Sequence, residues 1–196
     1  MNKDELEGLL QELDVELMNA FPGPERIHIL VVGGACLLFT GVTDRPTRDV
    51  DVIITDLFGT GSACMAVNPN KDARKVWRII GDIGKSHGLR GTDRWFLNDD
   101  CAPFLAELGD IPAAHVWKQC VKLVIMIPDD LSYILACKLI AARPDKDLGD
   151  IAALRKLLHV STREQAQAVV DRFFPDRDLQ DLYDLPNNLD RIFGPA

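Results

Sequence analysis

The chain has 196 residues, of which 47% are hydrophobic and 27% are charged, and this balance excludes disorder and fibrous repeats. The formal net charge of −8 comes from the two ends, −5 over residues 1–26 and −3 over residues 161–196, while the middle is neutral. Charge alone therefore neither supports nor excludes an RNA partner. Without a membrane-length apolar run or a basic, apolar signal peptide, we expect a cytoplasmic protein with no membrane partner.

The potential metal-binding side chains are scattered along the sequence. The five cysteines form no C-x-x-C pair, and the four histidines show no ligand spacing. We therefore expect reduced, mostly buried cysteines and no zinc site.

The first half of the chain alternates helical and strand patterns. Leucines recur at helical spacing near the N-terminus, where Asn2 and Glu5 resemble a capping box. The expected elements, in order, are a helix over 3–20, a buried strand over 27–32, a short buried helix after Gly33 and Gly34, a strand over 49–54, a helix over 72–86 and a short strand over 94–97.

The second half begins with strands and continues as helices. The expected elements are strands over 114–118 and 121–127, a helix capped by Asp129 and Asp130 that runs to about Arg143, a helix over 148–158, a helix that starts at a Ser161–Glu164 capping box and stops at Pro175, and short helical turns over 178–196. The pattern predicts an α+β fold. Residues 1–128 would form a sheet-containing core with an N-terminal helix, and residues 129–196 a helical region packed on it.

Two carboxylates in one predicted strand, Asp49 and Asp51, are the first candidate site residues. Residues i and i+2 of a strand point to the same face, so these side chains repel each other unless a cation lies between them. Mg²⁺ is commonly held by one or two carboxylates together with substrate phosphates. An isolated pair of this kind is more often a solvated strand face.

Gly33 and Gly34 stand at a predicted strand-to-helix junction. Without side chains there, a phosphate can approach the backbone N–H groups of the first helical turn. A simple tight turn or the start of a dinucleotide-binding fold are the alternatives. The dinucleotide alternative lacks the G-x-G-x-x-G pattern.

In combination, Val32-Gly33-Gly34 followed by Asp49-Val50-Asp51 resembles the nucleotidyltransferase superfamily with the DNA polymerase β-like core. The run RPTRDVDV is similar to minimal bacterial members, including families related to the abortive-infection type IV toxins. The resemblance implies a nucleotidyltransferase-type mixed sheet flanked by helices, with a helical C-terminal lobe. It spans roughly residues 28–158.

A second segment, ILACKLIAARPDKDLGDIAALRKLL, resembles the C-terminal part of those toxin-like families. The family carries a lysine in a helix followed by an aspartate, here Lys138 with Asp147 and Asp150, and Arg143 lies between them. By this resemblance Lys138 contacts the triphosphate, and the aspartate orients the lysine or the acceptor. A solvated lysine and an N-capping Asp147 are the ordinary alternatives.

The resemblance implies transfer of a nucleotide from a nucleoside triphosphate to a hydroxyl acceptor, with loss of pyrophosphate. Asp49 and Asp51 would hold Mg²⁺ or Mn²⁺, Gly33 and Gly34 the phosphates, and Arg48 and Lys138, with Arg143 nearby, a cationic clamp. The catalytic set would be Asp49, Asp51, Lys138 and Asp150. The acceptor is open between tRNA or another RNA end, a protein and a small molecule. A toxin would have an antitoxin protein as its partner.

One departure from the family concerns the third catalytic carboxylate. The strand VKLVIMI, where many members carry it, has no acid, which leaves Asp99, Asp100 and Asp150 as candidates. The alternatives to an enzyme are a catalytically silent nucleotidyltransferase-fold module that binds or regulates, and an interaction protein with acidic terminal helices.

Overall fold

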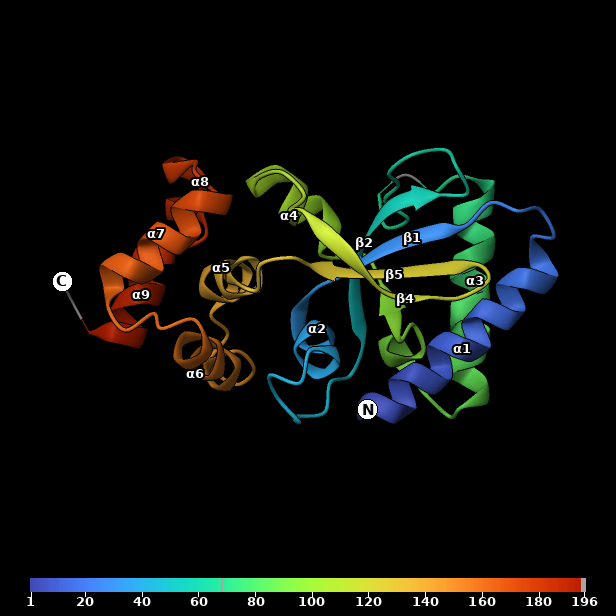
Figure 1. Cartoon of the computed structure of the whole chain (residues 1–196), viewed down its shortest axis with the longest axis horizontal. Helices are drawn as coiled ribbons and strands as arrows, with labels where there is room; N and C mark the ends of the chain where they lie inside the picture. The colour runs from blue at the N-terminus through green and yellow to red at the C-terminus, as the bar shows by residue number, and fades with distance from the viewer. Residues whose placement is uncertain (68, 195–196) are drawn as a thin grey trace. The chain divides into compact units, whose positions relative to one another are not determined.

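The computed structural model describes residues 1–67 and 69–194 and has an α+β fold (Figure 1). Its elements are α1 (Lys3–Ala20), β1 (Ile27–Val31), α2 (Gly33–Phe39), β2 (Val50–Leu57), α3 (Lys71–Ser86), the 3-10 turn η1 (Gly91–Arg94), β3 (Leu97–Asn98), α4 (Ala102–Leu108), β4 (Ala114–Gln119), β5 (Leu123–Pro128), α5 (Ser132–Ala141), α6 (Leu148–Leu157), α7 (Arg163–Phe173), α8 (Arg177–Leu182) and α9 (Leu185–Phe193).

The chain divides into two compact units. The first consists of residues 1–103 and 114–127, and the second of residues 104–113 and 128–196. The second unit thus includes a short segment that precedes the expected boundary near residue 128. None of the helices in residues 1–67 and 69–194 has the length and apolar character needed to cross a membrane.

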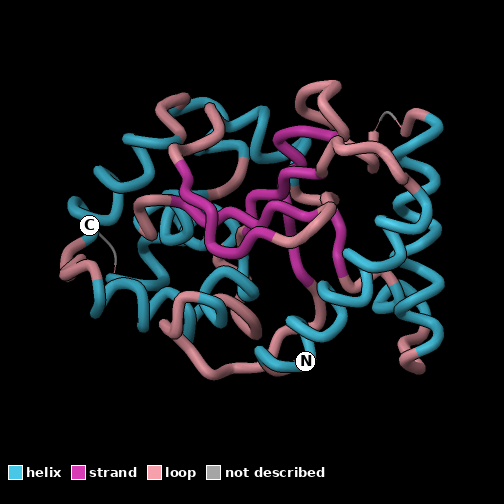
Figure 2. The backbone as a smooth tube through the Cα atoms, turned by 45° about the vertical axis from the view of Figure 1, so that its right-hand side comes forward, coloured by secondary structure: helices cyan, strands magenta, loops and turns pink. Residues whose placement is uncertain are grey.

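The centre of the first unit is a five-stranded mixed sheet with the strand order β3-β2-β1-β5-β4. Figure 2 shows its strands in magenta. β1 pairs antiparallel with β2 and parallel with β5, and β2 pairs parallel with the two-residue strand β3. β1 and β5 are buried along nearly their whole length, which explains their continuous apolar sequences. The expected mixed sheet flanked by helices is therefore confirmed.

The N-terminal helix α1 forms as its sequence predicts. Asn2 and Glu5 make a reciprocal capping box, and the leucines of one helical face are buried. Asp14, on the same buried face, accepts hydrogen bonds from the backbone N–H groups of Val121, Lys122 and Leu123 at 3.1, 2.6 and 2.8 Å. Through these hydrogen bonds the Asp14 carboxylate holds α1 against the turn that leads into β5.

The expected strand over 94–97 is wrong in its position. Residues 91–94 form η1, and the strand pairing is limited to Leu97 and Asn98. Gly84 of α3 explains the difference, because a Cβ built on it would lie 1.9 Å from the carbonyl oxygen of Arg94. The backbone of η1 therefore packs directly against α3, and its residues do not join the sheet. The sequence also gave no indication of α4.

The second unit is built around α5, seven of whose ten residues are buried. α5 ends at Ala141, earlier than expected, because Ala142 adopts a left-handed conformation with φ +33°. Asn188 of α9 donates hydrogen bonds to the carbonyl oxygens of Leu139 and Ile140 in the last turn of α5, at 3.3 and 2.8 Å. These bonds satisfy carbonyl groups that a helix end leaves without partners.

The capping box expected at Ser161 and Glu164 is wrong by one residue. Thr162 is the N-cap of α7, and its reciprocal partner is Gln165. The side-chain oxygen of Gln165 also accepts from the N–H of Ser161 at 2.8 Å. Gln165 therefore satisfies both N–H groups, and the box forms at Thr162. α7 ends at Phe173, two residues before Pro175, as expected.

Candidate functional site

Gly33 and Asp51, predicted to act together, are in close contact. β1 and β2 run side by side, and the N–H of Val32 donates to the carbonyl oxygen of Asp51 at 2.9 Å. Gly33 begins α2 with φ +63°, and a Cβ built on it would lie 2.7 Å from Oδ2 of Asp51. Only glycine combines that backbone conformation with that approach of the carboxylate. The first turn of α2 and the carboxylate of Asp51 thus form one surface.

Asp49 lies directly before β2, so the strand begins one residue later than the sequence predicts. Asn98 of β3 pairs in register with Asp51, and its side-chain amide donates to Oδ2 of Asp49 at 3.4 Å. The buried side chain of Asn98 therefore contacts Asp49 and helps to orient its carboxylate. The sequence analysis missed this role for Asn98, because only the parallel pairing of β2 with β3 brings it there.

Gly34 faces the loop that precedes Asp49. A Cβ built on Gly34 would lie 3.2 Å from Oγ1 of Thr47 and 3.8 Å from Nη2 of Arg45. The guanidinium group beside the glycine pair is thus that of Arg45, which the sequence analysis did not single out. Arg48, the predicted cation, is exposed just before β2. The alternation of polar residues in RPTRDVD could have suggested Arg45, since Arg45 and Thr47 precede Asp49 and Asp51 at the same two-residue spacing.

Asp99 is a poor candidate for the third carboxylate at this site. It follows Asn98 and is only 3% exposed, and its Oδ2 accepts a hydrogen bond from the N–H of Met65. Burial raises its pKa, against the lowering effect of hydrogen bonds from residues 64–66. Asp99 therefore organises the loop after β2. Its neighbour Asp100 is exposed.

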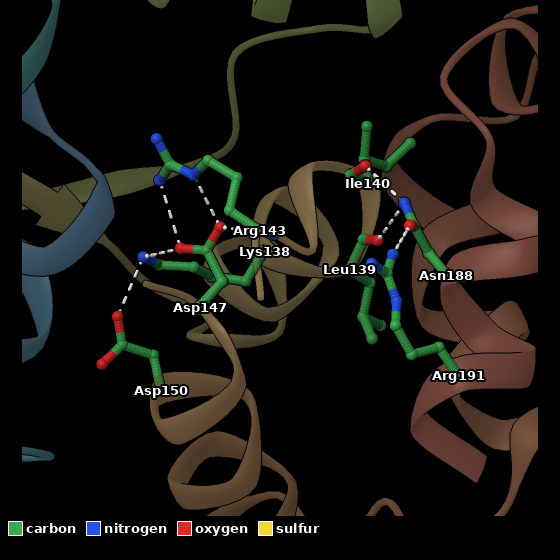
Figure 3. A network of polar contacts seen from close by, with 8 residues as sticks. All are labelled: Lys138, Leu139, Ile140, Arg143, Asp147, Asp150, Asn188 and Arg191. Carbon is green, nitrogen blue, oxygen red and sulfur yellow. Dashed lines mark hydrogen bonds and ion pairs between the residues drawn. The ribbon is translucent and has the colours of Figure 1, made fainter. Parts of the chain in front are cut away.

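The second group of predicted residues forms a charged cluster inside the second unit (Figure 3). Nζ of Lys138 lies 2.7 Å from Oδ1 of Asp147 and 2.9 Å from Oδ2 of Asp150. The side chain of Arg143 donates to both oxygens of Asp147, at 2.7 and 3.1 Å. Lys138, Asp147 and Asp150 are all at most 5% exposed. Two positive and two negative charges thus balance within the cluster.

Asp147 is the centre of this cluster. It stands at the N-cap position of α6, but its side chain caps no N–H group of that helix. It binds Lys138 and Arg143 instead, so the N-capping alternative is wrong. Burial alone would raise the pKa of Asp147, and its hydrogen bonds and ion pairs with Arg143 and Lys138 outweigh this effect and lower the pKa to about 2. The carboxylate therefore stays ionised at neutral pH.

The predicted site residues thus form two groups, each described within its own unit. In the first unit, Gly33 lies against Asp51 and Asn98 binds Asp49, while in the second unit Lys138, Arg143, Asp147 and Asp150 are joined by ion pairs. Residues 1–67 and 69–194 contain no group of three or more His, Cys, Asp or Glu side chains arranged to hold a metal ion. The two oxygen-donor side chains of Asp49 and Asp51 fit Mg²⁺ in the manner that relies on substrate phosphates for further ligands.

No known protein-family model, curated protein or solved structure matches this chain. The case for its function therefore rests on the chemistry of its own residues.

Proposed function

We propose that the protein is a Mg²⁺-dependent nucleotidyltransferase that moves a nucleotide from a nucleoside triphosphate to a hydroxyl acceptor. The observation that carries the proposal is the approach of Gly33 to Asp51, where a Cβ would lie 2.7 Å from the carboxylate oxygen. The partly exposed backbone of Gly33 and a carboxylate of the kind that binds a hard cation thus lie side by side. Simple tight turns need no carboxylate at that position.

In this proposal the residues of the first unit bind and orient the triphosphate. Mg²⁺, held by Asp49 and Asp51, would supply charge neutralisation at the phosphates. The N–H groups of the first turn of α2 have no intrahelical acceptors and can bind phosphate oxygens. Asn98 holds Asp49 through its amide, and Arg45 adds a positive charge beside Gly34. Positioning and charge neutralisation provide most of the catalysis in reactions of this type.

The resemblance assigns Lys138 to the triphosphate, which stays a prediction from the sequence, and the structure describes this lysine within the second unit alone. A lysine ammonium has three donors, and Asp147 and Asp150 accept from it on two sides. The two carboxylates thus hold the ammonium in one orientation. Asp150 serves in this proposal as the orienting acid. Arg143 binds Asp147 and so acts on Lys138 indirectly.

A silent nucleotidyltransferase-fold module is the second candidate, and one observation favours it. β5 carries no acid, and the carboxylate of Asp99 binds the loop after β2, so a third carboxylate is not evident beside Asp49 and Asp51. Such a module would bind Mg²⁺ and a nucleoside triphosphate without turning it over.

The experiment that tests the proposed binding chemistry is calorimetric titration with each of the four nucleoside triphosphates in Mg²⁺. Asp51→Asn is expected to weaken binding of the preferred triphosphate by about tenfold or more, equivalent to about 1.4 kcal/mol. Asp44→Asn removes the same charge from an exposed position in the preceding loop and is expected to bind normally. Equal affinities for wild type and Asp51→Asn would contradict the metal assignment.

A further inference from the structure

The outer surface of α3 and η1 combines exposed cations with two aromatic rings that contact each other. We call it the α3–η1 face, and its residues are Lys71, Arg74, Trp77, Arg78, Arg94 and Trp95. Residues 71–95 contain seven basic and three acidic residues, a local net charge of +4 in a chain of net charge −8. The nucleotidyltransferase proposal leaves this surface without a role.

The cations and Trp77 share one flank of α3. Arg74 is three residues from Lys71 and from Trp77 and four from Arg78, so its side chain neighbours all three on the helix surface. All four are exposed, and Trp77 retains 39% of its surface. The acidic Asp82 lies on the flank toward α1, where it lines a small pocket with Glu12 and Glu16. Asp72 stands in the first turn of α3, and Asp93 in η1.

Two glycines of α3 fix the aromatic part of the face. A Cβ on Gly81 would lie 3.0 Å from Nε1 of Trp95, and a Cβ on Gly84 would overlap the carbonyl group of Arg94. The rings of Trp77 and Trp95 are 5.4 Å apart at 32°, and the guanidinium of Arg94 lies 3.7 Å from the centre of the Trp95 ring. Trp95 therefore contacts both Arg94 and the tilted ring of Trp77, and the packing of Trp95 and Arg94 on the two glycines of α3 holds these groups in place.

We propose that the α3–η1 face binds a single-stranded nucleic acid. Its chemistry has two parts, because the cations match phosphate charges and the flat groups of Trp77 and Arg94 match base faces. An acidic peptide would bind the cations but would leave the flat groups of Trp77 and Arg94 without a partner. The binding itself is independent of the proposed transfer reaction. The further step, that the bound strand is an RNA acceptor, rests on the proposed function.

The test measures binding of short fluorescein-labelled oligouridylate and oligothymidylate by anisotropy, at several salt concentrations. Trp77→Leu is expected to weaken binding roughly tenfold, since stacking on one ring is lost. Lys71→Gln with Arg78→Gln is expected to lower the slope of log affinity against log salt by about 1.4, or about 0.7 for each phosphate contact. Lys156→Gln, an exposed lysine of α6, is the matched control and is expected to bind normally.

Binding of either oligonucleotide with these variant effects supports the proposal, and stronger binding of the oligouridylate identifies RNA as the ligand. The proposal would be overturned if neither oligonucleotide binds at low salt. It would also be overturned if Trp77→Leu and the Lys71→Gln/Arg78→Gln variant both bind as tightly as wild type. Polyglutamate that competes as well as unlabelled oligouridylate would also overturn it in favour of an acidic protein partner. Asp49→Ala/Asp51→Ala is expected to retain oligonucleotide binding, which separates failure of this proposal from failure of the transfer reaction.

Discussion

Substitution of Gly33 by alanine tests the close approach on which the candidate site depends. Gly33 has φ +63°, a conformation that an L-residue adopts at a cost of about 1–2 kcal/mol. The new Cβ would also lie 2.7 Å from Oδ2 of Asp51, so the carboxylate must move. We expect the free energy of unfolding to fall by about 1–3 kcal/mol and triphosphate binding to weaken in the same variant.

Gly34→Ala is the matched control. Gly34 has no positive φ, and its Cβ would meet Oγ1 of Thr47 at 3.2 Å, a contact that a small shift relieves. Alanine is a better helix former than glycine by about 1 kcal/mol, which offsets that contact. We expect the stability of this variant to stay within about 1 kcal/mol of wild type. Urea unfolding and calorimetric titration measure both properties, and a Gly33→Ala protein as stable and as tightly binding as wild type would refute the reasoning.

Two further predictions concern stability. Asp14→Ala leaves the buried N–H groups of Lys122 and Leu123 without an acceptor and is expected to lower the free energy of unfolding by about 2–4 kcal/mol. Asp14→Asn is expected to cause a smaller loss. Equal losses for the two variants in urea unfolding would argue against the hydrogen bonds as the cause. The lowered pKa of Asp147 stabilises the fold fully above the ordinary value of 3.8, and this stabilisation, about 2 kcal/mol, is lost as the pH falls toward about 2. Asp147→Asn should flatten that part of the pH profile of stability, and an unchanged profile would contradict the assignment.

Local sequence was sufficient to predict the elements whose patterns are strong. The leucine spacing of α1 and the apolar runs of β1 and β5 each fix one structure over many residues. The N-cap of α7 is Thr162 and not Ser161, because both residues are good N-caps and their residue types alone do not decide which of them begins the helix. η1 forms where an extended segment was expected, because Gly84 lets its backbone pack on α3.

In the candidate site too, the residues that belong to a strong local pattern could be predicted from the sequence. The glycine pair and the D-x-D pair are visible in the sequence because each is a short local pattern and their combination is unusual. Asn98 and Arg45 were missed because long-range pairing places them, Asn98 through β3 and Arg45 through the contact of its loop with Gly34. The buried position of Lys138 was suggested by its apolar neighbours, and the structure shows that its carboxylate partners are Asp147 and Asp150.

The measurement that tests the central claim most directly is a nucleotidyl transfer assay. The full chain is incubated with Mg²⁺, a cell extract as the source of acceptors and each of four α-labelled nucleoside triphosphates, beside Asp49→Ala/Asp51→Ala as the control. The account predicts label in an RNA, protein or small-molecule product that the control does not form. Label formed equally by the control, or no label from a protein that binds the Mg²⁺-triphosphate, would contradict catalysis at Asp49 and Asp51.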